Sequence, residues 1–186
     1  MATDTADRLR DAVLTSIRRH GYAGTSMQDL LRETGVSSSS MYHFFPGGKE
    51  ELVASAVRAH GLEAATRIAE VLESHEVAEA IELIFAAAAT EMGDHDFALG
   101  CPIGVPATEA PADSEAIQRA VADVFAAWAE AYASALRASG LPADEASRLG
   151  RFIVASYEGS VTLARATRST APYRDATALI AVHLTR

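Results

Sequence analysis

Apolar side chains recur along most of the chain at the three- and four-residue spacings of a single helix face. Near the start, Leu9, Val13 and Ile17 form such a stripe among arginines and aspartates, which predicts an amphipathic helix. Gly21 and Gly24 are expected to end it, because glycine commonly closes helices. The first predicted element is therefore a helix that stops before residue 25.

Two short helices are predicted next. Thr25 and Gln28 have the spacing of a capping box, so Thr25 is expected to cap a helix that ends at Gly35. Ser37 is expected to cap a second helix of barely two turns, and the Pro-Gly-Gly segment 46–48 then breaks the chain. Two short helices joined by a tight turn describe a helix-turn-helix, over 26–33, 34–36 and 37–44.

The remainder is helical in pattern, and no strand alternation stands out. A long helix starts at Lys49, and Pro172 opens the last one. Segment 92–111 is rich in glycine and proline and is expected to be a break with one short helix inside. The prediction is an all-α fold of about nine helices, with an N-terminal three-helix domain at 1–47 and a larger helical bundle at 48–186.

Composition supports this fold class and narrows the environment. Apolar residues make up 49% of the chain but aromatics only 6%, so alanine, the strongest helix former, is abundant. The one cysteine, Cys101, excludes an intrachain disulfide, and apolar runs such as 83–89 are too short to cross a membrane. Asp4, Asp7 and Asp11 are followed by no signal-peptide core. We therefore expect a soluble, reduced, cytoplasmic protein.

The net charge of −9 argues at first against a nucleic-acid partner, since phosphate binding normally needs a basic surface. Its distribution changes that inference. Residues 1–60 hold seven basic and seven acidic side chains, so all nine net negative charges lie beyond residue 60. The first third of the chain is neutral, so its charge does not exclude DNA binding.

Four consecutive serines open the second helix of the predicted helix-turn-helix. Serine is a poor interior helix former, because its hydroxyl competes for backbone hydrogen bonds. A serine-rich linker is the alternative, which the flanking Gly35-Val36 and aromatic residues disfavour. Hydroxyls, a helix N-terminus and one lysine suit phosphate contacts on DNA. The side chains concerned are Ser37, Ser38, Ser39, Ser40, Tyr42, His43 and Lys49.

Three segments here resemble the DNA-binding domain of TetR-family transcriptional regulators: 25–30, 35–37 and 41–52. The Pro-Gly-Gly-Lys turn at 46–49 and the later Gly-Cys-Pro-Ile-Gly segment at 100–104 are similar to the LmrA/YxaF-like branch. The resemblance implies a dimer that binds a palindromic operator, with the third helix in the major groove. It implies phosphate contacts from Ser26, Tyr42, His43 and Lys49, and base and backbone contacts from Ser38, Ser39 and Ser40.

Two positions depart from the family pattern. Relatives often have Lys or Arg at position 38 and Gly at position 39, so the serines here remove charge and shorten reach. Fewer cationic contacts predict a shallow salt dependence of DNA binding.

The C-terminal bundle is expected to bind an effector and to dimerise. The break at 93–111 is where a bundle could open to admit a small apolar or aromatic molecule, and an acidic surrounding would tolerate or attract a cation. Helices at about 144–168 and 172–185 are expected to form a four-helix interface from two copies. Plain core is the alternative for aromatics at helical spacing. Candidate pocket residues are Phe85, Met92, Phe97, Cys101, Phe125, Trp128, Tyr132 and Tyr157; candidate dimer contacts are Leu149, Phe152, Ile153, Ser156, Tyr157, Ser160 and Leu179.

No pattern supports a metal, a cofactor or catalysis. Glu91 and His95 have a ligand-like spacing, flanked by Asp94 and Asp96, but a solvated loop is the simpler interpretation. Cys101 has no neighbouring base or cation in sequence to activate its thiol.

The sequence thus predicts a ligand-responsive transcriptional regulator and not an enzyme: a homodimeric repressor released from operator DNA by a small apolar or aromatic effector. The alternative is a helical binding or scaffold dimer whose helix-turn-helix no longer reads DNA, which the uncharged recognition helix motivates. An enzyme of unrecognised type is a distant third.

Overall fold

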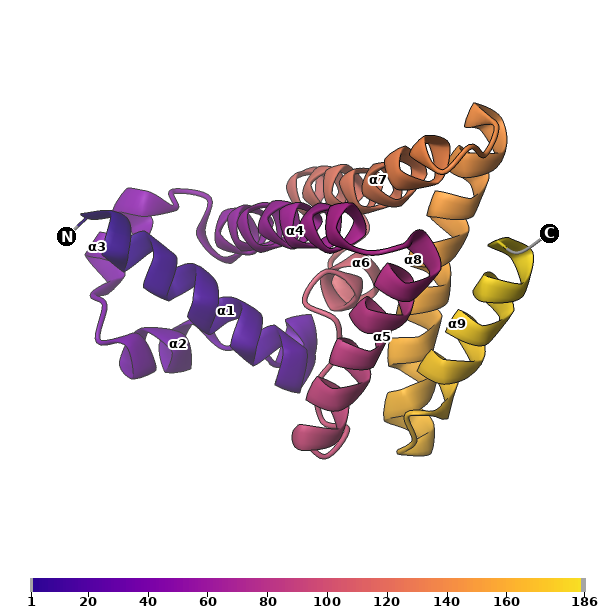
Figure 1. Cartoon of the computed structure of the whole chain (residues 1–186). Helices are drawn as coiled ribbons and strands as arrows, with labels where there is room; N and C mark the ends of the chain where they lie inside the picture. The colour runs from indigo at the N-terminus through magenta and orange to yellow at the C-terminus, as the bar shows by residue number, and fades with distance from the viewer. Residues whose placement is uncertain (1, 185–186) are drawn as a thin grey trace. The chain divides into compact units, whose positions relative to one another are not determined.

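The computed structural model describes residues 2–184, with side chains from residue 4 onward, and every regular element in that range is a helix (Figure 1). The nine helices found there confirm the predicted all-α class; residue 185 of the expected last helix lies outside the described residues. The helices are α1 (Ala2–Gly24), α2 (Met27–Thr34), α3 (Ser38–Phe44), α4 (Gly48–Ser74), α5 (Val77–Asp94), α6 (Gly104–Glu109), α7 (Glu115–Ala138), α8 (Ala143–Thr167) and α9 (Ala171–Leu184).

The link between α1 and α2 differs in part from the prediction. Gly21 has φ 77° and ψ 174°, so it interrupts the helix as expected, and one further turn follows it. The capping-box prediction for Thr25 is wrong. The N-cap of α2 is Ser26, whose hydroxyl accepts from the Asp29 amide at 3.3 Å. Thr25 is buried, and its hydroxyl donates to the Gly21 carbonyl at 2.8 Å.

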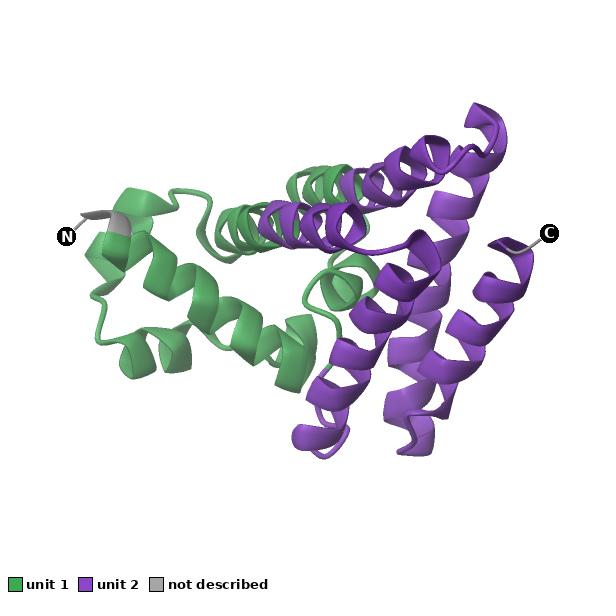
Figure 2. Ribbon diagram, in the orientation of Figure 1, with its two compact units in different colours: residues 1–61, 100–124 green, residues 62–99, 125–186 purple. Residues whose placement is uncertain are grey.

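The chain divides into two compact units (Figure 2). Unit 1 comprises residues 1–61 and 100–124, and unit 2 comprises residues 62–99 and 125–186. The long helices α4 and α7 each contribute to both. The functional boundary that the sequence suggests, after residue 47, remains a prediction.

In unit 1, α1 packs against α2, α3 and α6. Its predicted stripe of Leu9, Val13 and Ile17 is completely buried. Complete burial of three branched apolar side chains contributes about 1.5–3 kcal/mol each to the hydrophobic driving force. This stripe is therefore a main source of the stability of unit 1.

The segment 100–104 docks on α1 through paired hydrogen bonds. The Gly100 amide donates to the Arg18 carbonyl at 2.8 Å, and the Arg18 side chain returns a bond to the Gly100 carbonyl at 3.0 Å. At the end of α6, the Glu109 carboxylate accepts from the Tyr22 amide at 2.8 Å. Cys101 is buried inside this segment, so the motif similar to the LmrA/YxaF branch belongs structurally to unit 1.

In unit 2, α5, α8 and α9 pack on one another. Phe85 of α5 meets Tyr157 of α8 edge to face at a ring distance of 5.4 Å, and both rings contact Tyr173 of α9. Edge-to-face pairs add about 0.5–1.5 kcal/mol beyond their burial. This aromatic cluster joins the three helices.

The loop after α5 is fastened to the end of α8. The Arg168 guanidinium donates to both the carboxylate and the carbonyl of Asp96 and lies over the ring of Phe97. Asp96 and Phe97 both have positive φ, 53° and 58°, an uncommon conformation for residues with a side chain. Within the described part of the chain, no helix is both long and apolar enough to cross a membrane.

The close packing of α7 against α8 at Gly150 predicts that stability depends sharply on this residue. A Cβ atom there would lie 2.4 Å from the carbonyl oxygen of Ala129, whereas one at Gly159, on the same helix, would meet nothing within 4 Å. Gly150→Ala should lower the free energy of unfolding by about 1–3 kcal/mol, because backbone must move. Gly159→Ala should raise it by up to about 1 kcal/mol through helix propensity. Urea unfolding followed by circular dichroism measures both; equal stabilities would contradict this packing.

Candidate nucleic-acid interface

A helix-turn-helix is formed by α2, a short turn and α3. Gly35 closes α2 in the left-handed conformation, with φ 66° and ψ 14°, which glycine adopts without steric cost. Ser37 caps α3 as predicted, its hydroxyl accepting from the Ser40 amide at 3.1 Å. The turn and cap together fix where the second helix begins.

The inner face of this motif is apolar and buried. Leu30 of α2, Val36 of the turn, Met41 in the middle of α3 and Phe45 just after its end are all less than one tenth exposed. Of the two adjacent phenylalanines, Phe45 is buried in this core, whereas Phe44 is half-buried. The core therefore holds α3 by one side and leaves its other side to solvent.

The outer face carries nearly all the predicted DNA contacts. Tyr42 is 54% exposed, and the Ser38, Ser39 and His43 side chains are exposed as well. Ser26 is exposed at the start of α2, while Ser40 is half-buried beneath the cap made by Ser37. The structure thus brings the hydroxyl groups of both helix starts to solvent.

Lys49 occupies a different environment from the one predicted for a phosphate contact. Its ammonium donates to the carbonyl of Tyr22 at 2.5 Å and to that of Thr25 at 2.7 Å. It also lies 4.3 Å from the centre of the Tyr22 ring, within the range of a cation–π interaction. Burial lowers the pKa of Lys49 below the usual lysine range. In this structure, Lys49 ties the start of α4 to the link between α1 and α2.

Sequence reasoning did not predict how two residues, Thr25 and Arg8, position the motif. Thr25 closes the turn that follows Gly21, with its hydroxyl 3.1 Å from that of Ser16. Arg8 donates to the carbonyl of Thr34 at the end of α2, where a cation satisfies a terminal carbonyl and complements the helix dipole. Neither role has a local sequence signal, because each partner comes from another turn or helix.

A separate cavity of about 350 Å³ lies in unit 2. Helices α4, α5, α7 and α8 line it, and most of its lining is apolar. Three of the predicted pocket residues line it: Trp128, Tyr132 and Tyr157. The other lining residues are Ala64, Arg67, Ile68, Val71, His75, Leu83, Ile84, Ala87 and Val154.

The remaining predicted pocket residues lie elsewhere. Phe85 belongs to the aromatic cluster with Tyr173, and Phe125 packs against Trp128 in a T-shaped arrangement. Met92 is buried near the end of α5, and Phe97 lies beneath Arg168. Cys101 is part of unit 1. None of these five lines the cavity.

The acidic loop after α5 does not form a metal site in the structure. Asp96 is paired with Arg168, and among the described side chains no group of three His, Cys, Asp or Glu residues is placed to hold an ion.

An exposed, hydroxyl-rich α3 on a helix-turn-helix, followed by a helical unit with an apolar cavity, is the architecture of a ligand-binding transcriptional regulator. The profile described as "Bacterial regulatory proteins, tetR family" matches residues 9–56, and that of the "Transcriptional regulator LmrA/YxaF-like, C-terminal domain" matches residues 77–179. The chain belongs to the TetR family of transcriptional regulators. It is a DNA-binding regulator with the C-terminal domain of the LmrA/YxaF-like group.

Individual proteins agree with this assignment. The chain is 29% identical to the HTH-type regulator YxaF of Bacillus subtilis (strain 168), covering 91% of this chain and 89% of YxaF. It is 32% identical to an HTH-type regulator of Mycobacterium tuberculosis (strain ATCC 25618 / H37Rv), covering 84% of this chain and 81% of that protein. The crystal structure of a TetR protein from Rhodobacter sphaeroides has the same fold, with a TM-score of 0.83 at 23% identity, covering 95% and 97% of the two chains.

The position of Lys49 predicts a variant that separates stability from phosphate binding. Lys49→Met keeps the length of the side chain but removes the donor for two carbonyls, so stability should fall by about 1–3 kcal/mol. If Lys49 contacts no phosphate in the complex, the slope of log affinity against log salt should stay that of the parent protein. Urea unfolding and mobility shifts at several salt concentrations, with DNA from the promoter next to its own gene, measure both. A slope reduced by about one unit would instead show a phosphate contact.

Proposed function

We propose that the protein is a homodimeric repressor that occupies a palindromic operator and leaves it when a small apolar or aromatic molecule fills the cavity of unit 2. The observation that carries the proposal is the outer face of α3, where Ser38, Ser39 and Tyr42 are exposed on a buried apolar support. The proposal assigns the protein no catalytic role. Since a bacterial operator is cytoplasmic, the proposed action takes place there.

The proposed DNA contacts rely on hydroxyl groups rather than on cations. Ser26, Ser38 and Ser39 offer short donors to the DNA backbone, and Tyr42 and His43 reach further. Hydroxyl groups that donate to DNA phosphates position a protein on DNA without adding positive charge to the interface. The expected binding is therefore specific in register but weak in its salt-dependent component.

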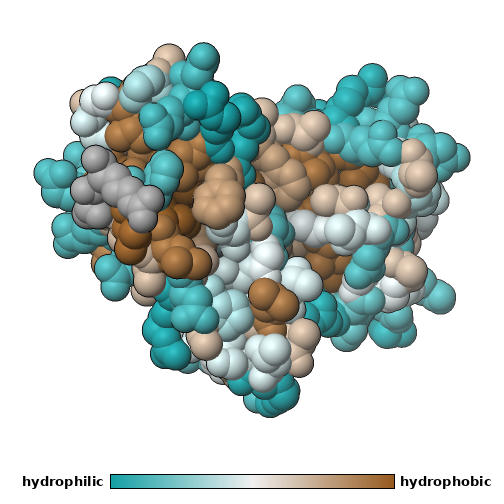
Figure 3. All heavy atoms as spheres, turned by 90° about the vertical axis from the view of Figure 1, so that its right-hand side faces the viewer, coloured by the Kyte–Doolittle hydropathy of each residue, from teal (hydrophilic) through white to brown (hydrophobic). Residues whose placement is uncertain are grey.

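The proposed dimer surface is on α8 and α9. Large apolar side chains are exposed there, at fractions from 52% to 72%, and Figure 3 views the face that α9 presents. Large apolar side chains that gather on an exposed face often mark association sites, and Phe152 and Leu179 line one groove. Ile153 and Ser160 are buried within their own protomer, so the proposed surface leaves them out. It consists of Phe152 and Leu179, as predicted, together with Leu163 and Val182.

A groove at this surface supports the proposal that a second copy of the chain binds there. The groove has a volume of about 520 Å³ and lies between α8 and α9. Its apolar lining comes from Leu149, Phe152, Leu179 and Ile180. Two copies related by a two-fold axis would each offer side chains to the groove of the other, as a self-complementary interface requires.

Helix α4 offers a route from effector to DNA. It is continuous from Gly48 to Ser74, begins shortly after α3, and supplies Ala64, Ile68 and Val71 to the cavity. A molecule that binds more tightly to one position of this helix shifts the population toward that position. Release follows if that form separates the two recognition helices by a distance that the operator does not match.

Tyr42 provides the test of DNA reading. Tyr42→Ala should weaken binding to the promoter DNA next to the gene by about tenfold, because it removes a hydrogen bond to a charged phosphate. Tyr42→Phe removes only the hydroxyl and should show most of that loss. Both variants should unfold at the parental urea concentration, since the side chain is 54% exposed. Mobility shifts measure the affinities. Absence of any DNA binding at low salt would favour the scaffold alternative.

Leu179 provides the test of the dimer. Leu179→Asp should convert the protein to a monomer, because it places a carboxylate at the most exposed large apolar side chain, 72% exposed. Leu62→Asp makes the same change at a 44% exposed leucine on α4 and should leave the dimer intact. Sedimentation velocity measures the state of each variant. A dimer that persists in Leu179→Asp and dissociates in Leu62→Asp would place the interface elsewhere.

A further inference from the structure

The side chains that line the unit 2 cavity include basic residues but no acidic ones. Among the described residues that line it, Arg67 is the one arginine or lysine and His75 is the one histidine. No Asp or Glu side chain lines it within the described residues, although the chain holds 25 acidic groups. The acidic excess expected to attract a cation is therefore absent from the lining.

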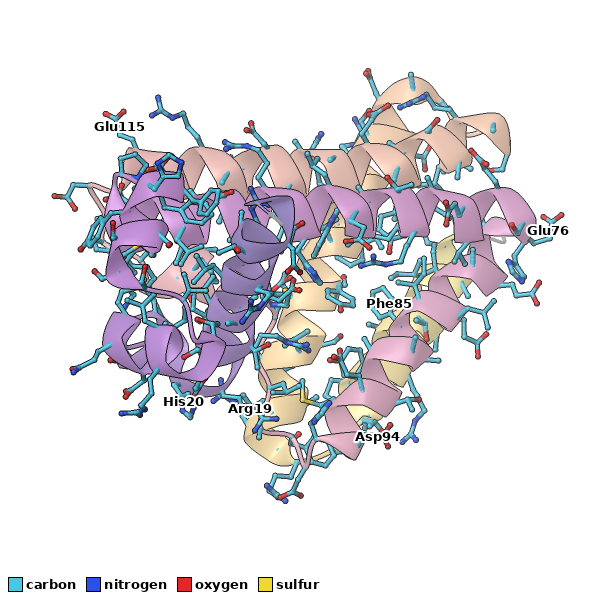
Figure 4. The ribbon with its side chains drawn as sticks, turned by 90° about the vertical axis from the view of Figure 1, so that its left-hand side faces the viewer. Arg19, His20, Glu76, Phe85, Asp94 and Glu115 are labelled. Carbon is cyan, nitrogen blue, oxygen red and sulfur yellow. The ribbon has the colours of Figure 1, made fainter. Side chains whose placement is uncertain are left out.

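Arg67 lies on α4, and His75 follows the last residue of that helix. Arg67 pairs with Glu63, one helical turn earlier, at 2.7 Å, and its side chain is 51% exposed. His75 follows the last turn of α4, with Nδ1 3.1 Å from the Val71 carbonyl. A carbonyl oxygen can only accept, so Nδ1 carries the proton and Nε2 is the second ring nitrogen. Glu76, labelled in Figure 4, lies in the turn that follows His75.

Another part of the lining is aromatic. Trp128 and Tyr132 come from α7 and Tyr157 from α8, and Trp128 meets Tyr157 edge to face at 6.2 Å. Burial raises the pKa of Tyr132 far above its usual value, so its hydroxyl is neutral at any physiological pH. Planar rings of this kind favour a flat, aromatic occupant.

The size of the cavity limits the occupant further. Its volume of about 350 Å³ is a little over twice the roughly 150 Å³ that suffices for one benzene molecule. Two or three rings fit such a space. The lining thus suits a ligand with apolar aromatic rings and a negatively charged group near α4.

Resting on the function proposed above, we propose that the effector is an aromatic acid whose rings lie against Trp128 and Tyr132 and whose anionic group pairs with Arg67, with His75 as a second donor. Glu63 competes with the anion for Arg67, so binding exchanges one ion pair for another. An anion that draws Arg67 away from Glu63 acts directly on α4, which carries both residues.

Two fluorescent probes that differ by one anionic group test this proposal. 8-Anilinonaphthalene-1-sulfonate carries a sulfonate, and N-phenyl-1-naphthylamine is the same ring system without it. Trp128 is the chain's one tryptophan and lines the cavity, so energy transfer from it reports probe binding, and the Arg67 variant tests whether that binding is in the cavity. The dissociation constant of each probe is measured for the parent protein, Arg67→Gln, Glu63→Gln and the control Arg165→Gln, an exposed arginine of α8 outside the cavity lining.

Arg67→Gln should weaken the sulfonate probe by about tenfold, as loss of a charge-assisted hydrogen bond implies, and should leave the neutral probe within about twofold. Glu63→Gln should tighten the sulfonate probe, because Arg67 loses its competing partner. Arg165→Gln should change neither. The result that would overturn the proposal is an equal effect of Arg67→Gln on both probes, or no effect on either, in a variant with parental urea stability.

Failure of this inference is distinguishable from failure of the proposed function. Operator binding by the parent protein, and its reversal by either probe, is measured in the same mobility-shift assay as Tyr42→Ala. Release by both probes with no Arg67 dependence would retain an effector-controlled repressor and reject the acid. Probe binding that depends on Arg67 without any operator binding would retain the acid site and reject the repressor.

Discussion

The burial of one face of α1 is the constraint on which the DNA-binding unit depends. Leu9, Val13 and Ile17 are completely buried, and α2, α3 and α6 all pack on this helix. α3 has only seven residues and begins with serines, so neither its length nor its propensity would keep it helical alone. It is helical because Met41 and Phe45 are buried. The outward serines therefore depend on the apolar face behind them.

Much of this could be predicted because it depends on local spacing. The α1 stripe, the cap at Ser37 and the outward side chains of α3 all follow from helical periodicity and turn chemistry. The cap of α2 is displaced by one residue, from Thr25 to Ser26, because the Thr25 hydroxyl bonds backward to Gly21 instead. Lys49 could not be placed from sequence, since its partner carbonyls become available only after the chain bends at Gly21.

The side-chain environments of unit 2 were less predictable, because they depend on contacts between helices that are distant in sequence. Helical spacing identifies an apolar face but does not say whether a partner helix, a ligand or solvent covers it. Phe85 and Trp128 have similar sequence contexts, yet Phe85 fills an aromatic cluster while Trp128 lines a cavity. Ile153 and Phe152 are adjacent, and only Phe152 is exposed. The sequence did not predict that Arg67 lines the cavity, because an arginine on a long helix is usually a solvated side chain.

The low charge of the proposed DNA-binding face affects how the proposed regulation would work. A reader that relies on serine and tyrosine hydroxyls gains little of the cation-dependent, sequence-independent attraction that retains other proteins on DNA. Its affinity must then come from two half-sites engaged at once, where binding of the first raises the effective concentration of the second. A change in separation removes that gain and leaves only a weak half-site. Under the proposed function, an effector would not need to disturb the reader itself, because a small displacement of α4 would be sufficient for release.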